Sequence, residues 1–387
     1  MSLIKVGVIG IGNMGSSHVQ MLDKGQIEGA ILTAICSSND SRIDWVENHT
    51  SGDVQIFRDE ETFFTESGID AVVIATPHYS HPEIAINAFS KGIHVLIEKP
   101  AGVYTKNVLE MNEAAESCGK VFGIMYNQRA NPLYQKLRDL IHSGKLGNIK
   151  RTNWIVTDTY RSQSYYDSSK WRATWKGEGG GVLLNQALHH LDIWQWVTGF
   201  MPKRVNAVSS FGKYHDIEVE DEVTAYVEYE NGVTGVFITS TGEVPGTNLL
   251  EVVGDFGKIV VENEELTFYR LTQSERDFNR LYKGGFGKPD YRKIDIPVKS
   301  ENANHATIFQ NWIDSINTGS PLLAPGKEGV KALEIANAIY LSSWLNQTVE
   351  LPVDPDHYYE RLQEKISTST FEKKHVTNNT LDVKGTH

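Results

Sequence analysis

The sequence predicts an α/β protein in which an N-terminal doubly wound parallel sheet is followed by an α+β domain with a large, mostly antiparallel open sheet. Over residues 1–125, short apolar runs alternate with helical patterns, as in parallel sheets joined by crossover helices. From about residue 148 the runs alternate apolar and polar residues, which is typical of antiparallel strands. We therefore expect domains over residues 1–125 and 126–350, followed by a polar C-terminal tail over residues 351–387.

Composition limits the partners and the compartment that we expect. With 387 residues, 40% of them hydrophobic, the chain is long enough for two cores. The formal net charge of -12 argues against attraction to nucleic acid or to an anionic membrane surface. Its two cysteines, Cys36 and Cys118, fall in apolar elements, which favours reduced thiols over a disulfide. With no leader-like N-terminus and no apolar run of about 18 residues, we expect a cytoplasmic protein without a membrane span.

The first element is a strand over residues 4–9, and a glycine-rich turn leads from it into a helix. Gly10 permits a tight turn, Gly12 allows the backbone to approach a pyrophosphate, and Gly15 allows the helix to pack on the strand. Asn13 and Met14 begin the helix, whose free amides would face the phosphates. The alternative is a glycine-rich turn that binds no ligand.

A second strand over residues 31–36 ends where a dinucleotide site usually offers an acidic residue to the ribose 2′-hydroxyl. Here the residue is Ser37, and Ser38 and Arg42 follow it. A small hydroxyl with a nearby guanidinium suits a 2′-phosphate, so NADP is favoured over NAD. The alternative is a polar turn in which Asp40 or a displaced side chain serves NAD.

Further strand and helix units continue the parallel pattern. Strands are predicted over residues 54–57 and 71–75, and helices over residues 59–67 and from Pro82 to Gly92. Thr76 and Pro77 follow the fourth strand. His78 and His81 come next, but no third ligand or carboxylate cluster lies at ligand spacing, so we expect no metal site.

The fifth strand, over residues 93–97, is followed directly by Glu98, Lys99 and Pro100. Proline cannot donate to a sheet ladder, so the two charged residues lie at the carboxyl end of this strand. Open α/β sheets bind ligands at that edge. We therefore expect Lys99 to face the seam between the two domains.

The second domain is predicted to hold a sheet that needs a cover. Its helices are expected over residues 132–143, 305–316 and 330–345, and its strands over residues 152–158, 205–211, 223–229, 235–241 and 249–253. The helix expected over residues 108–118 and the sixth strand over residues 121–125 belong to the first domain. Asn231-Gly232 is a hairpin signal, and residues beyond about Ser367 are polar and expected to be disordered. A sheet with one exposed apolar face favours a homodimer or homotetramer through that sheet.

A glycine run over residues 179–181 precedes an apolar helical pattern with polar positions. The spacing places Asn185, His189 and Asp192 on one helical face. A single histidine on an apolar helix is more often structural than catalytic. The neighbouring motifs favour the catalytic interpretation here.

These features together resemble the Gfo/Idh/MocA family of glucose-fructose oxidoreductases and inositol dehydrogenases over residues 5–347. The resemblance rests on the glycine-rich turn, Ala75-Thr76-Pro77, His81, Glu98-Lys99-Pro100, Trp171-Arg172, the glycine run, His189 and Asp192. It implies an N-terminal Rossmann domain, an NAD(P)-dependent dehydrogenase acting on sugars, glycosides or cyclitols, and Lys99 and His189 as the catalytic pair. The implied cofactor-binding residues are Gly10, Gly12, Asn13, Met14, Gly15, Ser37, Ser38, Arg42, Thr76, Pro77, His81, Glu98 and Lys99.

One position departs from the family pattern. The usual motif has aspartate where this chain has Asn185, and an amide cannot raise the basicity of His189 as a carboxylate would. Asparagine there resembles the branch that acts on C3 of sugars or sugar nucleotides. Ser37 with Arg42 is similar to NADP-using anhydrofructose reductases of the family.

Residue chemistry is consistent with a sugar dehydrogenase. His189 can take a hydroxyl proton, and Lys99 can stabilise the developing alkoxide. We expect the substrate to contact Lys99, Tyr160, Trp171, Arg172, Asn185 and His189. Packing in the sheet is the alternative for the aromatic residues. An NAD-dependent glycosidase and a non-catalytic dinucleotide-sensing regulator are the alternative functions, although a regulator would not need both Lys99 and His189.

Overall fold

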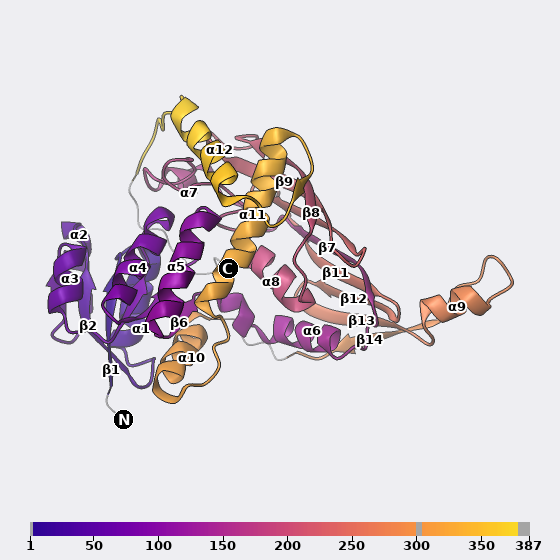
Figure 1. Ribbon diagram of the computed structural model, residues 1–387, viewed down its shortest axis with the longest axis horizontal. Helices are drawn as coiled ribbons and strands as arrows, with labels where there is room; N and C mark the ends of the chain where they lie inside the picture. Colours follow the sequence, from indigo (N-terminus) through magenta and orange to yellow (C-terminus); the bar gives the residue numbers. More distant parts are fainter. Residues whose placement is uncertain (1–2, 299–303, 378–387) are drawn as a thin grey trace.

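The computed structural model describes residues 3–298 and 304–377 and contains two sheets that lie side by side (Figure 1). The N-terminal sheet has six parallel strands in the order β3-β2-β1-β4-β5-β6. Its strands are β1 (Ile4–Ile9), β2 (Ala30–Cys36), β3 (Gln55–Phe57), β4 (Ala71–Ile74), β5 (His94–Ile97) and β6 (Phe122–Ile124). The order reverses between β1 and β4, so ligands are expected at the carboxyl ends of these two strands. The predicted doubly wound sheet is confirmed.

Helices cover both faces of this sheet, and apolar strands explain why. All residues of β4 are buried, as expected for a strand with helices on both sides. The helices are α1 (Asn13–Asp23), α2 (Asp40–His49), α3 (Glu60–Glu66), α4 (His81–Ser90) and α5 (Thr105–Cys118). Asp59 caps α3 by accepting from the Thr62 amide, and proline occupies the first turn of α4. Local sequence therefore helps to set where α3 and α4 begin.

Helix α10 (His305–Thr318) returns from the second half of the chain to pack on the N-terminal sheet (Figure 1). Gln310 exchanges two hydrogen bonds with the backbone of Glu28, and Pro325 forms a β-bridge with Gly123 of β6. A division of the chain at residue 125 therefore omits this returning segment from the N-terminal unit. Sequence periodicity predicted the helix but could not show which sheet it covers.

The second sheet has nine strands in the order β14-β13-β12-β11-β7-β10-β9-β8-β15. Its strands are β7 (Ile149–Val156), β8 (Arg204–Phe211), β9 (Glu220–Glu228), β10 (Thr234–Ser240), β11 (Asn248–Gly254), β12 (Gly257–Glu262), β13 (Glu265–Leu271), β14 (Tyr291–Ile296) and β15 (Val349–Glu350). Neighbours are antiparallel except β7 and β10. The hairpin predicted at Asn231-Gly232 joins β9 to β10, whereas β12 to β15 were not anticipated.

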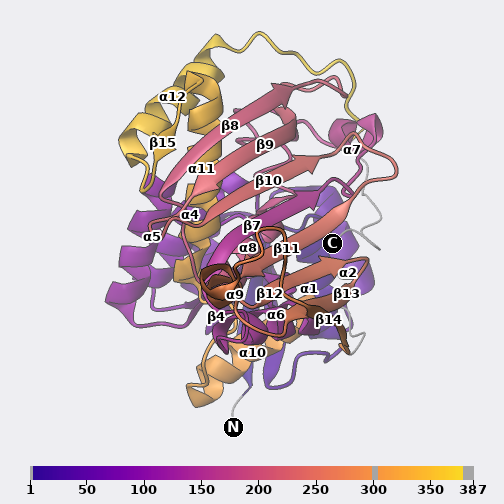
Figure 2. The same ribbon diagram turned by 90° about the vertical axis from the view of Figure 1, so that its right-hand side faces the viewer.

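Three helices lie between the two sheets and cover the inner face of the larger one (Figure 1). They are α6 (Pro132–His142), α8 (Leu188–Thr198) and α11 (Gly329–Leu345). The outer face is turned toward the viewer in Figure 2, and of the described helices only the short α9 (Glu275–Leu281) stands out from it. Side chains alternate accordingly, so Val227 is buried while its neighbour Tyr226 is 43% exposed.

The C-terminal segment differs from the predicted polar tail. Helix α12 (Pro355–Thr368) buries Tyr358 and Leu362 and packs on α5 and α11. Beyond it, Lys373 donates hydrogen bonds to the backbone oxygens of Tyr166 and Ser169. The expectation of disorder beyond about residue 367 is thus wrong for residues 368–377, because these contacts involve segments about 200 residues earlier. Residues 378–387 lie outside the described part of the chain.

Cys36 and Cys118 are both free thiols. Among the described helices, none combines the length and the apolar character needed to cross a membrane.

Candidate active site

The glycine-rich turn has the geometry of a phosphate cradle at the crossover between β1 and β4. Gly10 has a φ of +89°, and a side chain there would lie 2.7 Å from the backbone of Ala75 and Thr76. A Cβ on Gly15 would lie 1.9 Å from the Gly10 oxygen, so α1 approaches the turn closely. A Cβ on Gly12 meets no atom within 4 Å. Because α1 has no side-chain cap, the amides of its first turn, near Asn13 and Met14, remain available to an anion.

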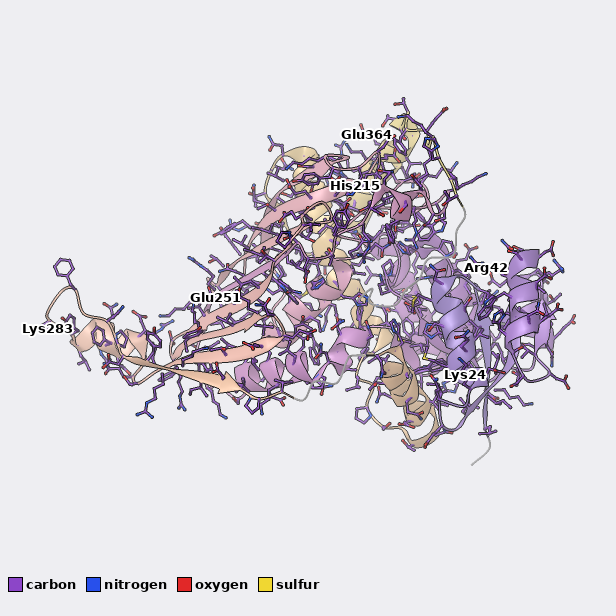
Figure 3. The ribbon with its side chains drawn as sticks, turned by 180° about the vertical axis from the view of Figure 1, so that it is seen from behind. Lys24, Arg42, His215, Glu251, Lys283 and Glu364 are labelled. Carbon is purple, nitrogen blue, oxygen red and sulfur yellow. The ribbon has the colours of Figure 1, made fainter. Side chains whose placement is uncertain are left out.

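Polar residues at the end of β2 form the candidate ribose site. The Ser37 hydroxyl accepts a hydrogen bond of 3.3 Å from the Asn39 amide, and Ser38 is exposed. Arg42, labelled in Figure 3, is the third residue of α2 and is partly buried. Sequence reasoning missed Arg58, which follows the neighbouring strand β3 and lies 2.6 Å from Asp40. Two guanidinium groups therefore lie on the elements next to this edge.

His81, which was expected to bind the cofactor, contacts the backbone of two loops beside the cradle. Its ring is fully buried, and its two nitrogens each lie 2.7 Å from a backbone oxygen, that of Thr76 and that of Pro100. Burial lowers the pKa of His81, although the two carbonyl groups oppose this change. Thr76 and Pro77 remain at the end of β4, opposite Gly10, where a cofactor would pass.

Glu98, which was also expected to bind the cofactor, contacts His18 and the backbone of Lys99. One carboxylate oxygen lies 2.7 Å from Nε2 of the buried His18, and the other accepts a 3.2 Å hydrogen bond from the Lys99 amide. Burial would raise the pKa of Glu98, but the contact with His18 outweighs it and lowers the pKa to about 2. Glu98 therefore holds the backbone of Lys99 in place. The peptide bond that follows, between Lys99 and Pro100, is cis.

Lys99 reaches from the N-terminal sheet to the second domain. Its Nζ donates to the backbone oxygen and to Oδ1 of Asn185, at 3.1 and 3.2 Å. The Asn185 amide nitrogen donates in turn to Glu178 and, at 3.2 Å, to the hydroxyl of Tyr165. Burial lowers the pKa of Lys99 to about 8, and the charges of Glu98 and Glu178 oppose this fall. Lys99 is thus still mostly a cation at pH 7.

Asn185 lies in a series of turns and not on the predicted helix. Helix α8 begins only at Leu188, because the preceding backbone is held by a buried carboxylate. Glu220 accepts hydrogen bonds from the amides of Gly181 and Leu183, at distances of 2.9 to 3.0 Å. The glycine run is needed here, since a Cβ on Gly181 would lie 2.1 Å from the backbone oxygen of Glu220.

His189 lies in the first turn of α8, at the same sheet edge as Lys99. Its ring packs edge-on against Tyr126, with 6.3 Å between ring centroids. Ile97 of β5 pairs with Ile124 of β6. Lys99 and Tyr126 each come two residues after this pair, so they lie at the same edge of the sheet. Both oxygens of Asp192, one turn further along α8, accept hydrogen bonds from the buried Arg129 at 2.7 and 2.8 Å.

The aromatic segment divides into a site wall and core packing. Arg172 lies over the rings of Tyr165 and Trp171, at 4.6 Å from each, and donates a 2.8 Å hydrogen bond to the Tyr165 hydroxyl. Through Tyr165, Arg172 and Trp171 adjoin Asn185 and Lys99. Tyr160 lies at the surface with 49% of its area exposed, and Trp175 is buried against Tyr340 and Trp344. Sequence reasoning did not single out Glu178, whose only signal was an acidic residue directly before the glycine run.

Comparison with known families agrees with this geometry. Residues 4–126 match the model of an oxidoreductase family with an NAD-binding Rossmann fold, and residues 134–260 match the GFO/IDH/MocA C-terminal domain. The chain belongs to the Gfo/Idh/MocA family. It is therefore an NAD(P)-binding oxidoreductase, as the resemblance implied.

Relatives of this Gfo/Idh/MocA protein extend over nearly the whole chain. A myo-inositol 2-dehydrogenase from Thermotoga maritima is 23% identical, and the alignment covers 90% of this chain and 98% of the relative. A D-apiose dehydrogenase from Paraburkholderia graminis is 24% identical over 90% of this chain and 89% of the relative. The WlbA dehydrogenase from Chromobacterium violaceum, solved with NADH and UDP-GlcNAcA, has a TM-score of 0.77 at 25% identity and covers 92% of this chain and 97% of its own.

Proposed function

We propose that this protein transfers hydride between NAD(P) and a secondary ring hydroxyl, at C3, of a sugar, glycoside or cyclitol. The observation that carries this proposal is the contact between Lys99 and Asn185 at the carboxyl edge of the parallel sheet. It places a cation beside an uncharged donor and acceptor, at the sheet edge where the glycine-rich turn would hold a dinucleotide. Sugar hydroxyls suit such mixed donor and acceptor groups.

The proposed chemistry divides the work between Lys99 and His189. Bound NAD(P) supplies the hydride acceptor. His189 takes the hydroxyl proton, and the Lys99 ammonium donates a hydrogen bond to the oxygen as negative charge develops on it. Asn185 keeps Lys99 in place and presents its amide to a neighbouring ring hydroxyl. Arg172 and Trp171 form the flat wall for the ring.

Substrate identity is supported by residue type and by the relatives. An amide at position 185 can donate as well as accept, which a carboxylate cannot do. The relatives named above include dehydrogenases of an inositol and of a pentose, and the WlbA structure contains a nucleotide sugar. Most of these names refer to a substrate or ligand that contains a cyclic polyol or a glycosyl unit. We propose that this chain acts on a pyranoside of that type.

The test is a screen of cyclitols, glycosides, sugar phosphates and nucleotide sugars with both oxidised cofactors. We expect net formation of reduced cofactor and a 3-keto product, identified by NMR after turnover. A lactone formed at the anomeric carbon, or activity only with acyclic alcohols, would contradict the role of Asn185. Release of a sugar without net reduction of cofactor would favour the glycosidase alternative.

We also propose that NADP is preferred, since Ser37 replaces an acidic residue and Arg42 and Arg58 lie nearby. Ser37→Asp should shift preference toward NAD, because a carboxylate accepts from the 2′-hydroxyl and repels a 2′-phosphate. Arg42→Ala should weaken NADP binding selectively. Fluorescence titrations would overturn the preference if the wild type bound NAD more tightly and Arg42→Ala bound both cofactors as the wild type does.

The outer face of the nine-stranded sheet supports a further proposal, that the protein is a homo-oligomer. Val208 is 66% exposed and Tyr226 is 43% exposed on adjacent strands β8 and β9. Val236 of β10 pairs with Tyr226 and extends the apolar strip across a third strand. A second copy of the same face would cover this strip symmetrically, which gives a homodimer, or a homotetramer if a second surface is used.

A further inference from the structure

A buried carboxylate, Glu178, lies behind the catalytic centre on the side away from the parallel sheet. Only 1% of its surface is exposed. One oxygen accepts a 2.6 Å hydrogen bond from the Ala173 amide, and the other accepts from the Asn185 side chain. Arg172 lies 3.8 Å away. Burial raises the pKa of Glu178, but its neighbours are donors and cations, which favour the ionised form.

The loop around Glu178 is built to hold this carboxylate. Ala173 has a φ of +56°, a conformation that non-glycine residues rarely adopt, and its amide points at the carboxylate. At Gly177 a Cβ would lie 2.4 Å from the Trp171 oxygen, so the loop closes tightly. The loop therefore brings a negative charge to a place that water does not reach.

Glu178 is linked to Lys99 through a single amide group. The Asn185 nitrogen donates to Glu178, which turns Oδ1 of the same amide toward Nζ of Lys99 at 3.2 Å. Without the carboxylate, the amide could rotate and present its NH₂ group to the ammonium. Glu178 thus fixes the orientation of Asn185, and its charge also acts on Lys99.

Several charged or titratable groups act on Lys99 or lie near it. The groups that affect it or lie against it are Glu98, Glu178, Arg161, Arg172, His78 and His81. Glu98 is occupied by His18 and the Lys99 amide, as described above. Arg161 and Arg172 both oppose the protonation of Lys99. Glu178 is therefore the carboxylate that offsets these cations on the substrate-domain side.

We propose that Glu178 is a positioning residue that supplies, through the Asn185 amide, the negative charge that a carboxylate at position 185 would otherwise supply. The inference rests on the proposed function, in which Lys99 stabilises the developing alkoxide. It adds that the uncharged position 185 works only together with the buried acid seven residues earlier. Here the Asn185 amide contacts Lys99, and the Glu178 carboxylate lies one hydrogen bond further away.

The proposal is tested by exchanging the two groups. Glu178→Gln removes the charge and places a donor against the Asn185 donor. Asn185→Asp alone places two carboxylates together. In the double variant, the glutamine oxygen accepts from Ala173 and its NH₂ group donates to the new carboxylate, which faces Lys99 directly. Each single variant should lower kcat at least about 10-fold, and the double variant should recover most of this loss because coupled neighbours are non-additive.

The pKa of Lys99 gives a readout that needs no substrate. Competitive labelling of lysine amines with a trace acylating reagent, followed by mass spectrometry, measures it in the intact protein. For charges separated by one amide, roughly 7 Å, at an effective dielectric constant of about 20, Glu178→Gln should lower this pKa by more than about 1. In the double variant the new carboxylate faces Lys99 directly, so the pKa of Lys99 should return at least to its wild-type value.

Glu218→Gln is the matched control. Glu218 accepts a 2.9 Å hydrogen bond from the Trp175 amide, so it holds the same loop without contacting Asn185. The pKa of Lys99 should be unchanged in this control. An unchanged pKa in Glu178→Gln, or a double variant no better than the sum of the single ones, overturns the proposal. If Glu178→Gln fails to fold, the double variant decides alone, because a pKa lowered by about 1 there contradicts the exchange.

Failure of the proposed function can be told apart from failure of the Glu178 proposal. In that case, no sugar would be oxidised by the wild type, while the labelling result would still report whether Glu178 controls Lys99.

Discussion

Lys99 is expected to cost the protein stability, so Lys99→Met should stabilise the fold while removing activity. The pKa of Lys99 is about 8 in the folded protein and 10.5 in its ordinary state. This difference corresponds to about 3 kcal/mol against the protonated form in the folded state. Methionine keeps most of the apolar stem and carries no charge. It also loses the two hydrogen bonds to Asn185, so a net gain of about 1 to 3 kcal/mol is expected at pH 7.

The direction of the pKa shift of Lys99 fixes how this gain in stability depends on pH. A lysine whose folded pKa is depressed penalises the folded state at every pH below about 8. The penalty fades as pH rises from about 8 to 10.5, because the unfolded chain then loses its proton as well. The advantage of Lys99→Met should therefore be constant below about pH 8 and should shrink above it.

Urea denaturation of both proteins at pH 7 and pH 9.5, at one fixed protein concentration and without cofactor, measures the effect. Turnover with the substrate found in the screen should fall at least about 100-fold in the same variant. Equal or lower stability of Lys99→Met at pH 7 would refute the reasoning about its burial. Near-normal kcat/KM would refute its catalytic role.

Three further changes test separate parts of the structure. His189→Ala should lower kcat at least about 100-fold and leave the cofactor Kd within about twofold, measured by fluorescence titration, because the proposed function places His189 at the reacting centre. Tyr226→Lys should reduce the oligomer mass in light scattering, since it places a charge in the exposed apolar strip of the outer face. A chain ended at Thr368 should show a raised KM for substrate with unchanged cofactor binding, because Lys373 no longer supports the backbone of Tyr166 and Ser169.

Each of these three variants has a result that would contradict the expectation. Weakened cofactor binding in His189→Ala would place that residue at the cofactor and not at the hydroxyl. Glu360→Lys on the exposed side of α12 is the control for Tyr226→Lys, and equal masses for both variants would exclude the sheet as the interface. An unchanged KM after truncation would show that residues 369–387 do not support the substrate segment.

Local sequence was sufficient wherever neighbouring residues decide the structure. The strand over residues 4–9, the glycine-rich turn and the helix that follows it were predicted where they occur, because turn geometry and apolar runs are local properties. The hairpin at Asn231-Gly232 was predicted for the same reason. The family motifs also lie within short segments, which is why the sequence indicated the family and the NAD(P)-binding domain.

Only the tertiary structure decided which side chains share a site. His81 and Glu98 lie in cofactor motifs, but their polar atoms are occupied by residues 19 and 80 positions away. Asn185 was assigned to a helix that begins three residues later, because Glu220, 35 positions further along the chain, holds the backbone of the residues before Asn185. Glu178 carries no local pattern, and its importance follows from burial and from the charge of Lys99 on another domain. The sequence by itself determined the fold class, the family and the candidate residues, whereas long-range hydrogen bonds and desolvation decided which of those residues can act on a ligand.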